Sequence, residues 1–334
     1  MTTIATKPRV MAGMRPTGGL HLGHLVGVLT QWAAFCDTAD AYFEIADLHA
    51  YTTGFEQPEA IRDARNEMVA VWLAAGVDPH KSTIFLQSAV PEIMELYALL
   101  GMIAPVSWLE RVPTYKSQID ALGGQIATYG FLGYPLLQLC DIAVVRGERV
   151  PVGRDQVAHL EFGREVVRRF NHLYGDGREV LVEPHPTLTE FAEVPGTDGR
   201  KMSKSYDNAI LIADDDETTT KKVRSMVTDP QKIRRGDPGR PEVCPVFALW
   251  RFVNPLKVDG IAAECRSGAL GCVADKGDFA EQLNEYLRPI RERLTVYRSD
   301  PAQVERIIAE GTARTREIAG AVIADVKHAM RLLP

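Results

Sequence analysis

Short apolar runs alternate with helical patterns along the first half of the chain, from about residue 10 to residue 185. The strands that this pattern predicts are Arg9–Ala12, Ala41–Ala46 and the STIFLQ run from Ser82. The helices predicted among them are about Gly23–Phe35, Pro58–Ala75 and Val90–Ile103. Strands that alternate with helices in this way predict an α/β fold, in which helices cover both faces of a doubly wound parallel sheet.

The pattern changes after about residue 186. Residues 190–208 are rich in Gly, Asp, Ser and Lys, which favours a loop, and helical periodicity dominates from about residue 215 to the end. We therefore expect a sheet-containing domain over residues 1–190, a loop over 191–210, and a C-terminal, mainly helical domain over 211–334.

Composition narrows the class of protein. The chain has 334 residues, of which 46% are hydrophobic and 25% charged, values typical of globular proteins. No apolar run is long enough to span a membrane, and the N-terminal residues lack a secretory apolar core, so we expect a cytoplasmic protein without a membrane partner. The net charge of −6 argues against non-specific coating of nucleic acid, and we expect no DNA partner.

The first candidate motif lies between the first predicted strand and the first long helix, in the segment GMRPTGGLHLGH from Gly13 to His24. A helix N-terminus beside the carboxyl end of a parallel strand suits phosphate. His21 and His24 can donate hydrogen bonds to phosphate oxygens, and Gly23 would let a nucleotide approach the backbone. Taken by itself, the segment is equally well explained as a glycine-rich turn with two surface histidines.

The second candidate motif is Lys201-Met202-Ser203-Lys204-Ser205, within the predicted loop. Two lysines on a loop can close over a triphosphate and neutralise its charge. An isolated pair of lysines at this spacing is more often a solvated basic loop, so this motif also needs a second observation.

Together, HLGH at 21–24 and KMSKS at 201–205 resemble the two signature sequences of class I aminoacyl-tRNA synthetases. In that family both segments bind ATP, with Mg²⁺ on its phosphates, across the crevice of a Rossmann-type domain. The resemblance implies that Lys201, Lys204, His21 and His24 are catalytic. It implies an ATP site made by Arg15, Pro16, Thr17, Gly23, His24, Lys116, Gly153, Arg154, Asp155, Lys201, Met202, Ser203, Lys204 and Ser205.

Several longer segments resemble the tryptophanyl enzymes of this family. They are GMRPTGGLHLGH at 13–24, DLHA at 47–50, YPLLQLCDI at 134–142, VPVGRDQ at 150–156 and HLEFGREVVRRFN at 159–171. The resemblance implies a homodimer that joins L-tryptophan to tRNA(Trp). It implies a tryptophan site made by Met11, Ala46, His49, Tyr134, Gln138, Asp141, Val150, Val152 and Gln156.

Asp141 is the residue that we expect to set amino-acid specificity. Tyr134, Gln138 and Asp141 are spaced by four and three positions, so they share one face of a helix predicted to begin near Pro135. A carboxylate there can accept a hydrogen bond from the indole N–H, which is a donor only. In the tryptophanyl enzymes an aspartate at this position contacts the indole nitrogen.

The chain departs from the family pattern at several positions, of which Gln138 keeps a tyrosyl enzyme open as an alternative. Gln138 stands where many tryptophanyl enzymes have methionine, and some tyrosyl enzymes carry a similar Tyr, Gln and Asp at equal spacing. Arg15 and Thr114 each replace a glutamine that is usual in the family. The alternatives are a tyrosyl-tRNA synthetase and a non-aminoacylating paralogue that binds tRNA.

The predicted helical domain carries Cys244, Cys265 and Cys272. Some tryptophanyl enzymes hold a four-iron cluster here through four cysteines, and the fourth position is Asp275 in this chain. We expect three reduced structural cysteines, with a cluster or zinc site as the alternative. The basic residues that would suit an anticodon loop are Lys221, Lys222, Arg224, Lys232, Arg234, Arg235 and Arg240.

Overall fold

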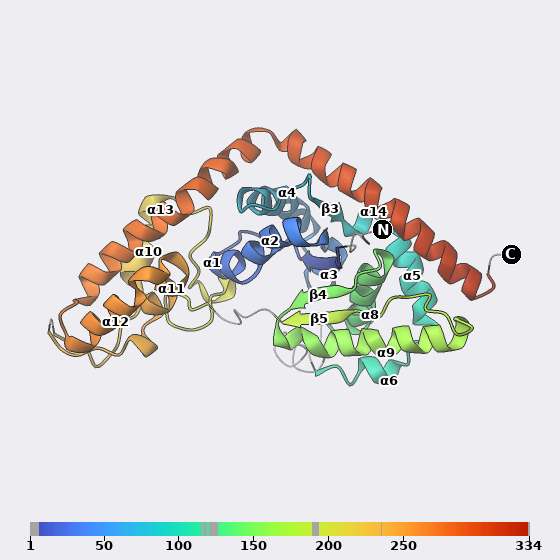
Figure 1. Cartoon of the computed structure of the whole chain (residues 1–334), viewed down its shortest axis with the longest axis horizontal. Coiled ribbons are helices and arrows are strands. Elements are labelled where there is room, and N and C mark those ends of the chain that lie inside the picture. The colour runs from blue at the N-terminus through green and yellow to red at the C-terminus, as the bar shows by residue number, and fades with distance from the viewer. Residues whose placement is uncertain are drawn as a thin grey trace, which may run out of the picture.

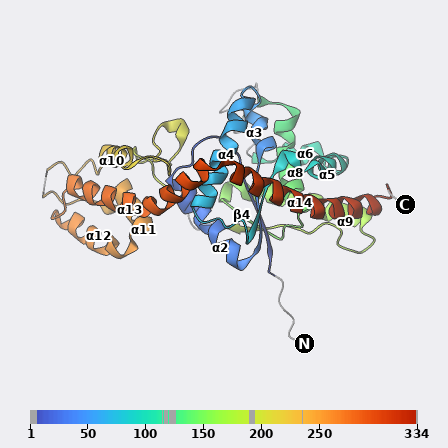
Figure 2. The same ribbon diagram turned by 90° about the horizontal axis from the view of Figure 1, so that it is seen from above.

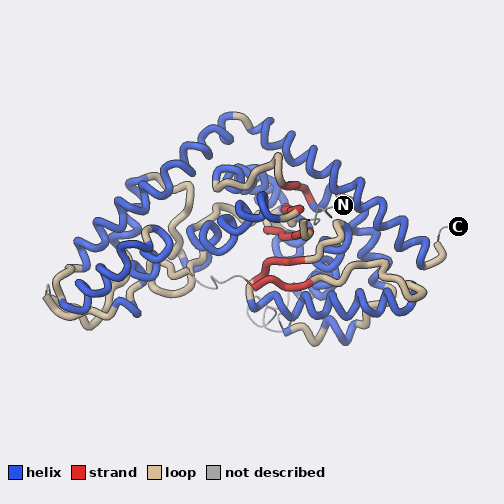
Figure 3. Tube along the Cα trace, in the orientation of Figure 1, coloured by secondary structure: helices blue, strands red, loops and turns tan. Residues whose placement is uncertain are grey.

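A parallel β-sheet lies at the centre of the protein, surrounded by helices (Figures 1 and 3). The computed structural model describes residues 7–113, 115, 119, 126–188, 194–234 and 236–332. The strands are β1 (Arg9–Met14), β2 (Asp40–Ile45), β3 (Ser82–Leu86), β4 (Arg149–Val152) and β5 (His185–Leu188). These five described strands are ordered β3-β2-β1-β4-β5, and every pair is parallel. The predicted doubly wound α/β fold is confirmed.

Strands β4 and β5 were not among the strands predicted individually. Their sequences, RVPV and HPTL, are four residues long and each contains a proline, which cannot donate a ladder hydrogen bond. Such a short segment carries no alternating pattern of its own. Both become strands because β1 offers a free edge on which β4 pairs, and β4 then pairs with β5.

The helices of the sheet-containing part are α1 (Leu22–His24), α2 (Thr30–Thr38), α3 (Asp47–Gly54), α4 (Pro58–Ala74), α5 (Pro91–Gly101), α6 (Val106–Leu109), α8 (Tyr129–Val144) and α9 (Val157–Tyr174). The helices predicted over Pro58–Ala75 and Val90–Ile103 agree with α4 and α5 to within two residues, whereas α3, α6 and α9 were not predicted. A π-helical turn over Leu25–Leu29 separates α1 from α2, where the sequence predicted one continuous helix. Such turns are frequent at functional sites, and this one follows directly on the HLGH motif.

Helix α8 begins earlier than predicted. Thr128 caps it by accepting a hydrogen bond from the backbone N–H of Phe131 at 3.2 Å, so the helix starts at Tyr129 rather than near Pro135. Pro135 consequently lies inside the helix, where it removes one backbone hydrogen bond. The predicted common face of Tyr134, Gln138 and Asp141 is unaffected, because all three positions remain helical.

Apolar side chains cover both faces of the sheet. On one face the ring of Trp32 stacks on Phe43 at 4.5 Å between centroids and meets the edge of Trp72 at 4.9 Å. On the other face Phe85 and Phe170 are fully buried among residues of α5, α8 and α9. The two apolar layers hold β1 and β4 in the middle of the molecule, with their carboxyl ends at the crevice described below.

The remaining helices are α10 (Asp216–Ser225), α11 (Pro245–Val253), α12 (Val258–Ser267), α13 (Cys272–Ser299) and α14 (Pro301–Ala329). Helices α10 to α12 gather at one end of the molecule, and α13 and α14 run from there back over the sheet (Figures 1 and 2). Among the described residues, no helix is long and apolar enough to cross a membrane. The domain boundaries drawn from the sequence stay predictions.

Helix α14 covers the edge of the sheet at β3. Thr312 Oγ1 accepts a hydrogen bond from the backbone N–H of Leu86 at 3.1 Å. A Cβ atom on Gly311 would lie 1.9 Å from the carbonyl oxygen of Ile84, so only glycine lets the helix approach the strand this closely. An exposed strand edge is prone to pair with other chains, and α14 protects this one.

Candidate active site

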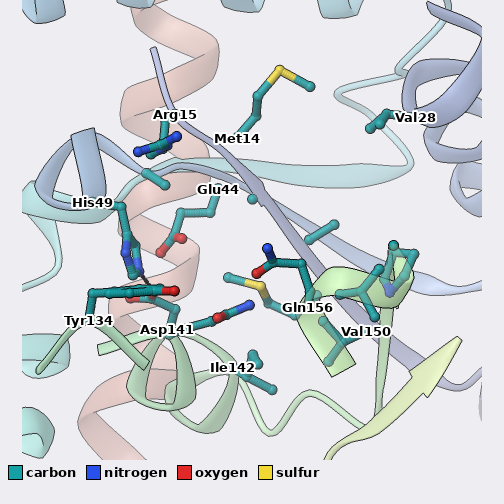
Figure 4. A pocket seen from close by; sticks show the side chains of 18 of the residues that line it. Met14, Arg15, Val28, Glu44, His49, Tyr134, Asp141, Ile142, Val150 and Gln156 are labelled. Atoms are coloured by element: carbon teal, nitrogen blue, oxygen red, sulfur yellow. Dashed lines mark hydrogen bonds and ion pairs between the residues drawn. The ribbon is translucent and has the colours of Figure 1, made fainter. Parts of the chain in front are cut away.

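A cavity of about 400 Å³ opens at the carboxyl ends of β1 and β4. These two strands are neighbours at the point where the strand order reverses, which is the usual ligand site in a doubly wound sheet. The end of β1 contributes Gly13 and Met14, the end of β4 contributes Val152, and α8 supplies a third wall (Figure 4). We refer to this cavity as the pocket.

Every residue that the sequence predicted for the amino-acid site lines the pocket. Its apolar wall includes Met11, Ala46, Val150 and Val152, all of them buried, together with Ile142. Its polar residues include His49, Tyr134, Gln138, Asp141 and Gln156. The pocket therefore has a surface for a flat apolar ring and a carboxylate at its side (Figure 4).

Asp141 is a buried acceptor held from two sides. Its side chain is only 1% exposed. Gln87 Nε2 donates to Oδ1 at 2.8 Å, and His49 Nε2 lies 2.8 Å from Oδ2. The Gln87 Oε1 atom in turn accepts from the backbone N–H of His49 at 3.3 Å. A buried carboxylate fixed in this way presents its remaining lone pairs in one direction.

Tyr134 belongs to a second series of hydrogen-bonded side chains, with His159 and Gln156. Its hydroxyl lies 2.7 Å from His159 Nε2, and His159 Nδ1 lies 2.8 Å from Gln156 Oε1. Because Gln156 Oε1 can only accept, His159 Nδ1 carries a proton and donates it to this oxygen. These hydrogen bonds fix Tyr134 and Gln156, both of which line the pocket.

The two histidines of the first motif are both neutral. His21 Nδ1 accepts from the backbone N–H of Gly23 at 3.1 Å, and His24 Nδ1 accepts from the backbone N–H of His21 at 3.2 Å. Burial, with the charge of Lys204 as a smaller cause, lowers the pKa of His21 to about 4. Burial, then His21 and Lys204, lowers the pKa of His24 to about 3. In both rings the proton therefore sits on Nε2, which is left as a donor.

Gly23 is required by its neighbour. A Cβ atom at this position would lie 2.9 Å from the His21 ring, which folds back over the start of the helix to cap it. The sequence suggested that this glycine makes room for a nucleotide. Within the protein itself, it makes room for the capping histidine.

The two motifs lie side by side. Lys204 Nζ donates to the backbone carbonyl of Thr17. Beyond the second motif, the backbone carbonyl of Ile210 accepts from the N–H of Leu22 at 3.0 Å, and the N–H of Ile212 donates to the carbonyl of Leu20 at 2.9 Å. The segment that follows KMSKS is therefore hydrogen-bonded to the segment that contains the start of HLGH.

Asn208 was not predicted as a functional residue from the sequence, although its side chain is hydrogen-bonded to the KMSKS segment. It is 1% exposed, and its Oδ1 accepts from the backbone N–H of Ser203 at 2.8 Å. Its Nδ2 donates to Asp198 Oδ1 at 2.7 Å and to the carbonyl of Lys201 at 3.1 Å. One side chain therefore holds the backbone of Lys201 and Ser203, the first and third residues of KMSKS. An asparagine in a loop carries no signal that distinguishes this role from an ordinary turn.

The residues predicted to bind ATP fall into separate groups. Arg15, His24 and Gly153 line the pocket, whereas the side chain of Met202 is 3% exposed and packs in the core. Lys116 and Thr114 lie outside the described residues, as does the side chain of Asp155. The exposed members of the predicted set are Arg15, Thr17, Arg154, Lys201, Lys204 and Ser205.

The family model for the class I tRNA synthetases of tryptophan and tyrosine matches residues 3–288. The chain belongs to this family. It is 40% identical to the tryptophan–tRNA ligase of Aquifex aeolicus, over 97% of this chain and 100% of that protein. It is 41% identical to the tryptophan–tRNA ligase of Thermotoga maritima, over 97% of this chain and 99% of that protein. The family expected from HLGH and KMSKS is confirmed.

Solved structures of the synthetase family have the same fold. The tryptophanyl-tRNA synthetase of Campylobacter jejuni, in complex with ADP and tryptophan, superposes with a TM-score of 0.87 at 30% identity, over 97% of this chain and 99% of that one. A tyrosyl-tRNA synthetase of Archaeoglobus fulgidus, in complex with L-tyrosine, has a TM-score of 0.68 at 22% identity, over 86% of this chain and 90% of that one. The second likeness shows the fold alone.

In this synthetase Cys244, Cys265 and Cys272 line a second, very small cavity of about 20 Å³ together with Asp275. Asp275 stands at the fourth cluster position, and its Oδ1 accepts from the buried indole N–H of Trp250 at 2.9 Å. No described group of His, Cys, Asp and Glu side chains is arranged to hold a metal ion. Burial raises the pKa of the Cys244 thiol, which opposes the thiolate form that an iron cluster needs. These residues, as described, do not fit an iron–sulfur cluster.

Several of the lysine and arginine residues predicted to contact an anticodon loop instead form hydrogen bonds within the protein. The side chain of Arg240 forms two hydrogen bonds with Asp229, at 2.7 and 3.1 Å, and Lys222 pairs with Asp214 at 2.7 Å. Lys232 is buried and donates to the carbonyl of Asp237 at 2.6 Å. Arg235 lies outside the described residues. The members that remain exposed are Lys221, Arg224 and Arg234.

Proposed function

We propose that this synthetase is a tryptophan–tRNA ligase. It activates L-tryptophan with ATP to tryptophanyl-adenylate, releasing diphosphate, and transfers the tryptophanyl group to tRNA(Trp), releasing AMP. The observation that carries the proposal is the buried carboxylate of Asp141, held by His49 and Gln87 at the side of an apolar pocket. An indole ring fills such a pocket and offers one N–H donor to the carboxylate.

The chain's own residues suit the activation step. The tryptophan carboxylate attacks the α-phosphorus of ATP, the bond from that phosphorus to the bridging oxygen breaks, and diphosphate leaves. His21 and His24 are neutral and offer Nε2–H donors at the helix N-terminus, while Lys204 adds a positive charge at the same place. Donors and cations that face a phosphate neutralise the charge that develops on it.

We propose that ATP brings Mg²⁺ with it. No described cluster of carboxylate and imidazole groups could bind the ion alone, so the phosphate oxygens would supply most of its ligands. The ion, when bound, lowers the negative charge of the phosphates. The lysines of the second motif would then act beside it on the departing diphosphate.

The proposal is tested by amino-acid-dependent exchange of labelled diphosphate into ATP. We expect exchange with tryptophan and little with tyrosine or phenylalanine. The variant Asp141→Ala is expected to lose discrimination against phenylalanine, because a pocket with an unpaired buried acceptor rejects the analogue lacking the donor by a factor of about 10⁴–10⁵. Absence of exchange with every amino acid would instead support the non-aminoacylating paralogue.

Tyrosine is the second candidate substrate, because Gln138 lines the pocket one helical turn from Asp141. An amide and a carboxylate together can bind a phenolic hydroxyl, which both donates and accepts. The matched variant is Gln138→Met. If the substrate is tryptophan, this change leaves exchange with tryptophan within about threefold, since an indole N–H needs no second polar partner.

We further propose that the enzyme acts in the cytoplasm as a homodimer that binds tRNA(Trp). The exposed apolar side chains of Met102, Val106 and Tyr129 lie on or beside α5, α6 and α8 and offer a surface for a second copy. Sedimentation at micromolar concentration is expected to give a dimer, and Val106→Asp is expected to give a monomer. A monomeric wild-type protein would refute the dimer.

A further inference from the structure

Glu44 is a buried acid in the pocket to which no role has yet been given. It lies on β2 opposite Gly13 of β1, and it is 2% exposed. A Cβ atom on residue 13 would lie 3.0 Å from Glu44 Oε2, so the glycine leaves room for the carboxyl group. Figure 4 shows this group projecting into the pocket on the side of His49 and Asp141.

The carboxyl groups of Glu44 and Asp141 line the same pocket, and both residues are buried, at 2% and 1% exposure. Glu44 Oε1 has no hydrogen-bond partner among the described residues. Two buried carboxylates in one pocket repel, so a proton that one group donates to the other stabilises the pair. Burial, then the charge of Asp141 and a hydrogen bond with it, then the charge of Asp47, raise the pKa of Glu44 well above its usual range. Glu44 is therefore the group that keeps a proton.

The acceptor positions of Asp141 can now be counted. A carboxylate accepts at about four lone-pair positions. Gln87 uses one on Oδ1, and His49 uses one on Oδ2. A proton that Glu44 donates to Asp141 would use a third. One position is left on a carboxylate that is otherwise surrounded by donors.

We propose that Glu44, as a neutral hydrogen-bond donor, positions Asp141 and leaves it a single acceptor position for the amino-acid substrate. Glu44 is a positioning residue, because it acts through Asp141. The inference rests on the proposed function in that this last position receives the indole N–H of tryptophan. It adds a residue outside the helix face of Tyr134, Gln138 and Asp141 to the machinery of specificity.

Two variants separate positioning from a merely structural role. Glu44→Gln keeps a donor of similar shape for Asp141, so we expect the KM for tryptophan in diphosphate exchange to stay within about twofold. Glu44→Leu removes the donor to a buried charge, so we expect that KM to rise about 10- to 100-fold. The KM for ATP is expected to stay unchanged in both, and thermal unfolding checks that each variant folds.

The pH profile gives a readout that packing alone would not move. At alkaline pH Glu44 loses its proton and repels Asp141, so we expect the KM for tryptophan to rise in the wild type. The other titratable or charged groups that line the pocket or face this carboxyl group are Asp47 and His49 from α3, Tyr134 from α8, His24 from α1, and Arg15 after β1. All of these groups remain in the Glu44→Gln variant. If the KM for tryptophan no longer rises at alkaline pH in this variant, the rise in the wild type is due to Glu44.

Each outcome decides the proposal. A folded Glu44→Leu variant with an unchanged KM for tryptophan overturns it, and so does a Glu44→Gln variant as impaired as Glu44→Leu. If Glu44→Leu does not fold, an alkaline rise that persists in Glu44→Gln overturns it. Failure of the proposed function is a different result, namely a wild-type protein without tryptophan-dependent exchange.

Discussion

Lys204 donates a hydrogen bond to the backbone carbonyl of Thr17, a residue that precedes it by 187 positions. The contact brings the second lysine of KMSKS onto the turn that leads into HLGH. Gly18, the next residue, has a φ angle of +99°, and a Cβ atom there would lie 3.2 Å from Lys204 Nζ. The turn is thus shaped to receive the lysine, and the two motifs form one site.

Replacing Lys204 is expected to remove activity while leaving the fold intact. Its charge faces the site where diphosphate would leave, so Lys204→Ala is expected to lower kcat for diphosphate exchange about 10²- to 10³-fold. Lys204 is exposed, so the melting temperature is expected to change little. Lys221→Ala, at an exposed lysine of α10, is the control and is expected to keep full activity. Wild-type kcat in Lys204→Ala would contradict the assigned role.

The depressed pKa of His24 predicts that the fold weakens in acid. His24 has a pKa of about 3 in the folded protein against an ordinary value of 6.5. Below pH 6.5 His24 binds a proton in the unfolded protein but stays neutral in the folded protein. The free energy of unfolding therefore decreases as the pH falls from about 6.5 towards 3. At pH 5 the loss is of the order of 1–2 kcal/mol for this group.

Urea unfolding at pH 7 and pH 5 measures this loss. The variant His24→Asn keeps an acceptor where Nδ1 stands but cannot be protonated in this range. The difference in unfolding free energy between the two pH values is therefore expected to be smaller in the variant than in the wild type. Equal differences in the two proteins would show that His24 titrates normally.

Asn208 is expected to matter for ATP through the loop that it holds. Asn208→Ala leaves the partly buried backbone groups of Lys201 and Ser203 without this partner, which costs about 1 kcal/mol of stability. Misplacement of Lys201 and Lys204 is expected to lower kcat/KM for ATP by about 10²-fold, with tryptophan binding by calorimetry unchanged. Asn254→Ala, which removes a hydrogen bond to Gln282 in the helical part, is the control. A normal kcat/KM for ATP in Asn208→Ala would contradict the prediction.

Asp275 is expected to contribute stability rather than metal binding. Asp275→Ala leaves the buried Trp250 N–H without its acceptor, at a cost of about 1–3 kcal/mol in unfolding free energy. Asp275→Asn keeps an acceptor oxygen and is expected to lose less. Purified wild-type protein is expected to be colourless and to contain no stoichiometric iron by elemental analysis. A brown protein with stoichiometric iron would overturn this account of the cysteines.

The sequence predicted the fold where a segment carries its own pattern. The predicted strands Arg9–Ala12 and Ala41–Ala46 agree with β1 and β2 to within two residues, because their apolar runs are flanked by clear turns. It did not predict β4 and β5 individually, since a four-residue strand with a proline is defined by its partner strand. It placed the start of α8 near Pro135 because proline favours first turns, whereas Thr128 caps the helix earlier.

What the sequence alone determined is the local chemistry: two histidines and a glycine at a helix start, two lysines on a loop, and three polar residues on one helix face. These follow from residue type and short spacing, and the structure gathers the helix-face residues in the pocket as expected. The tertiary structure alone decided which distant polar groups are buried together. Gln87 donates to Asp141 from the turn after β3, and Glu44 lines the same pocket from β2, because the sheet register and the packing of α8 place them there. Burial then raises the pKa of Glu44, since a low-dielectric site disfavours two neighbouring carboxylates.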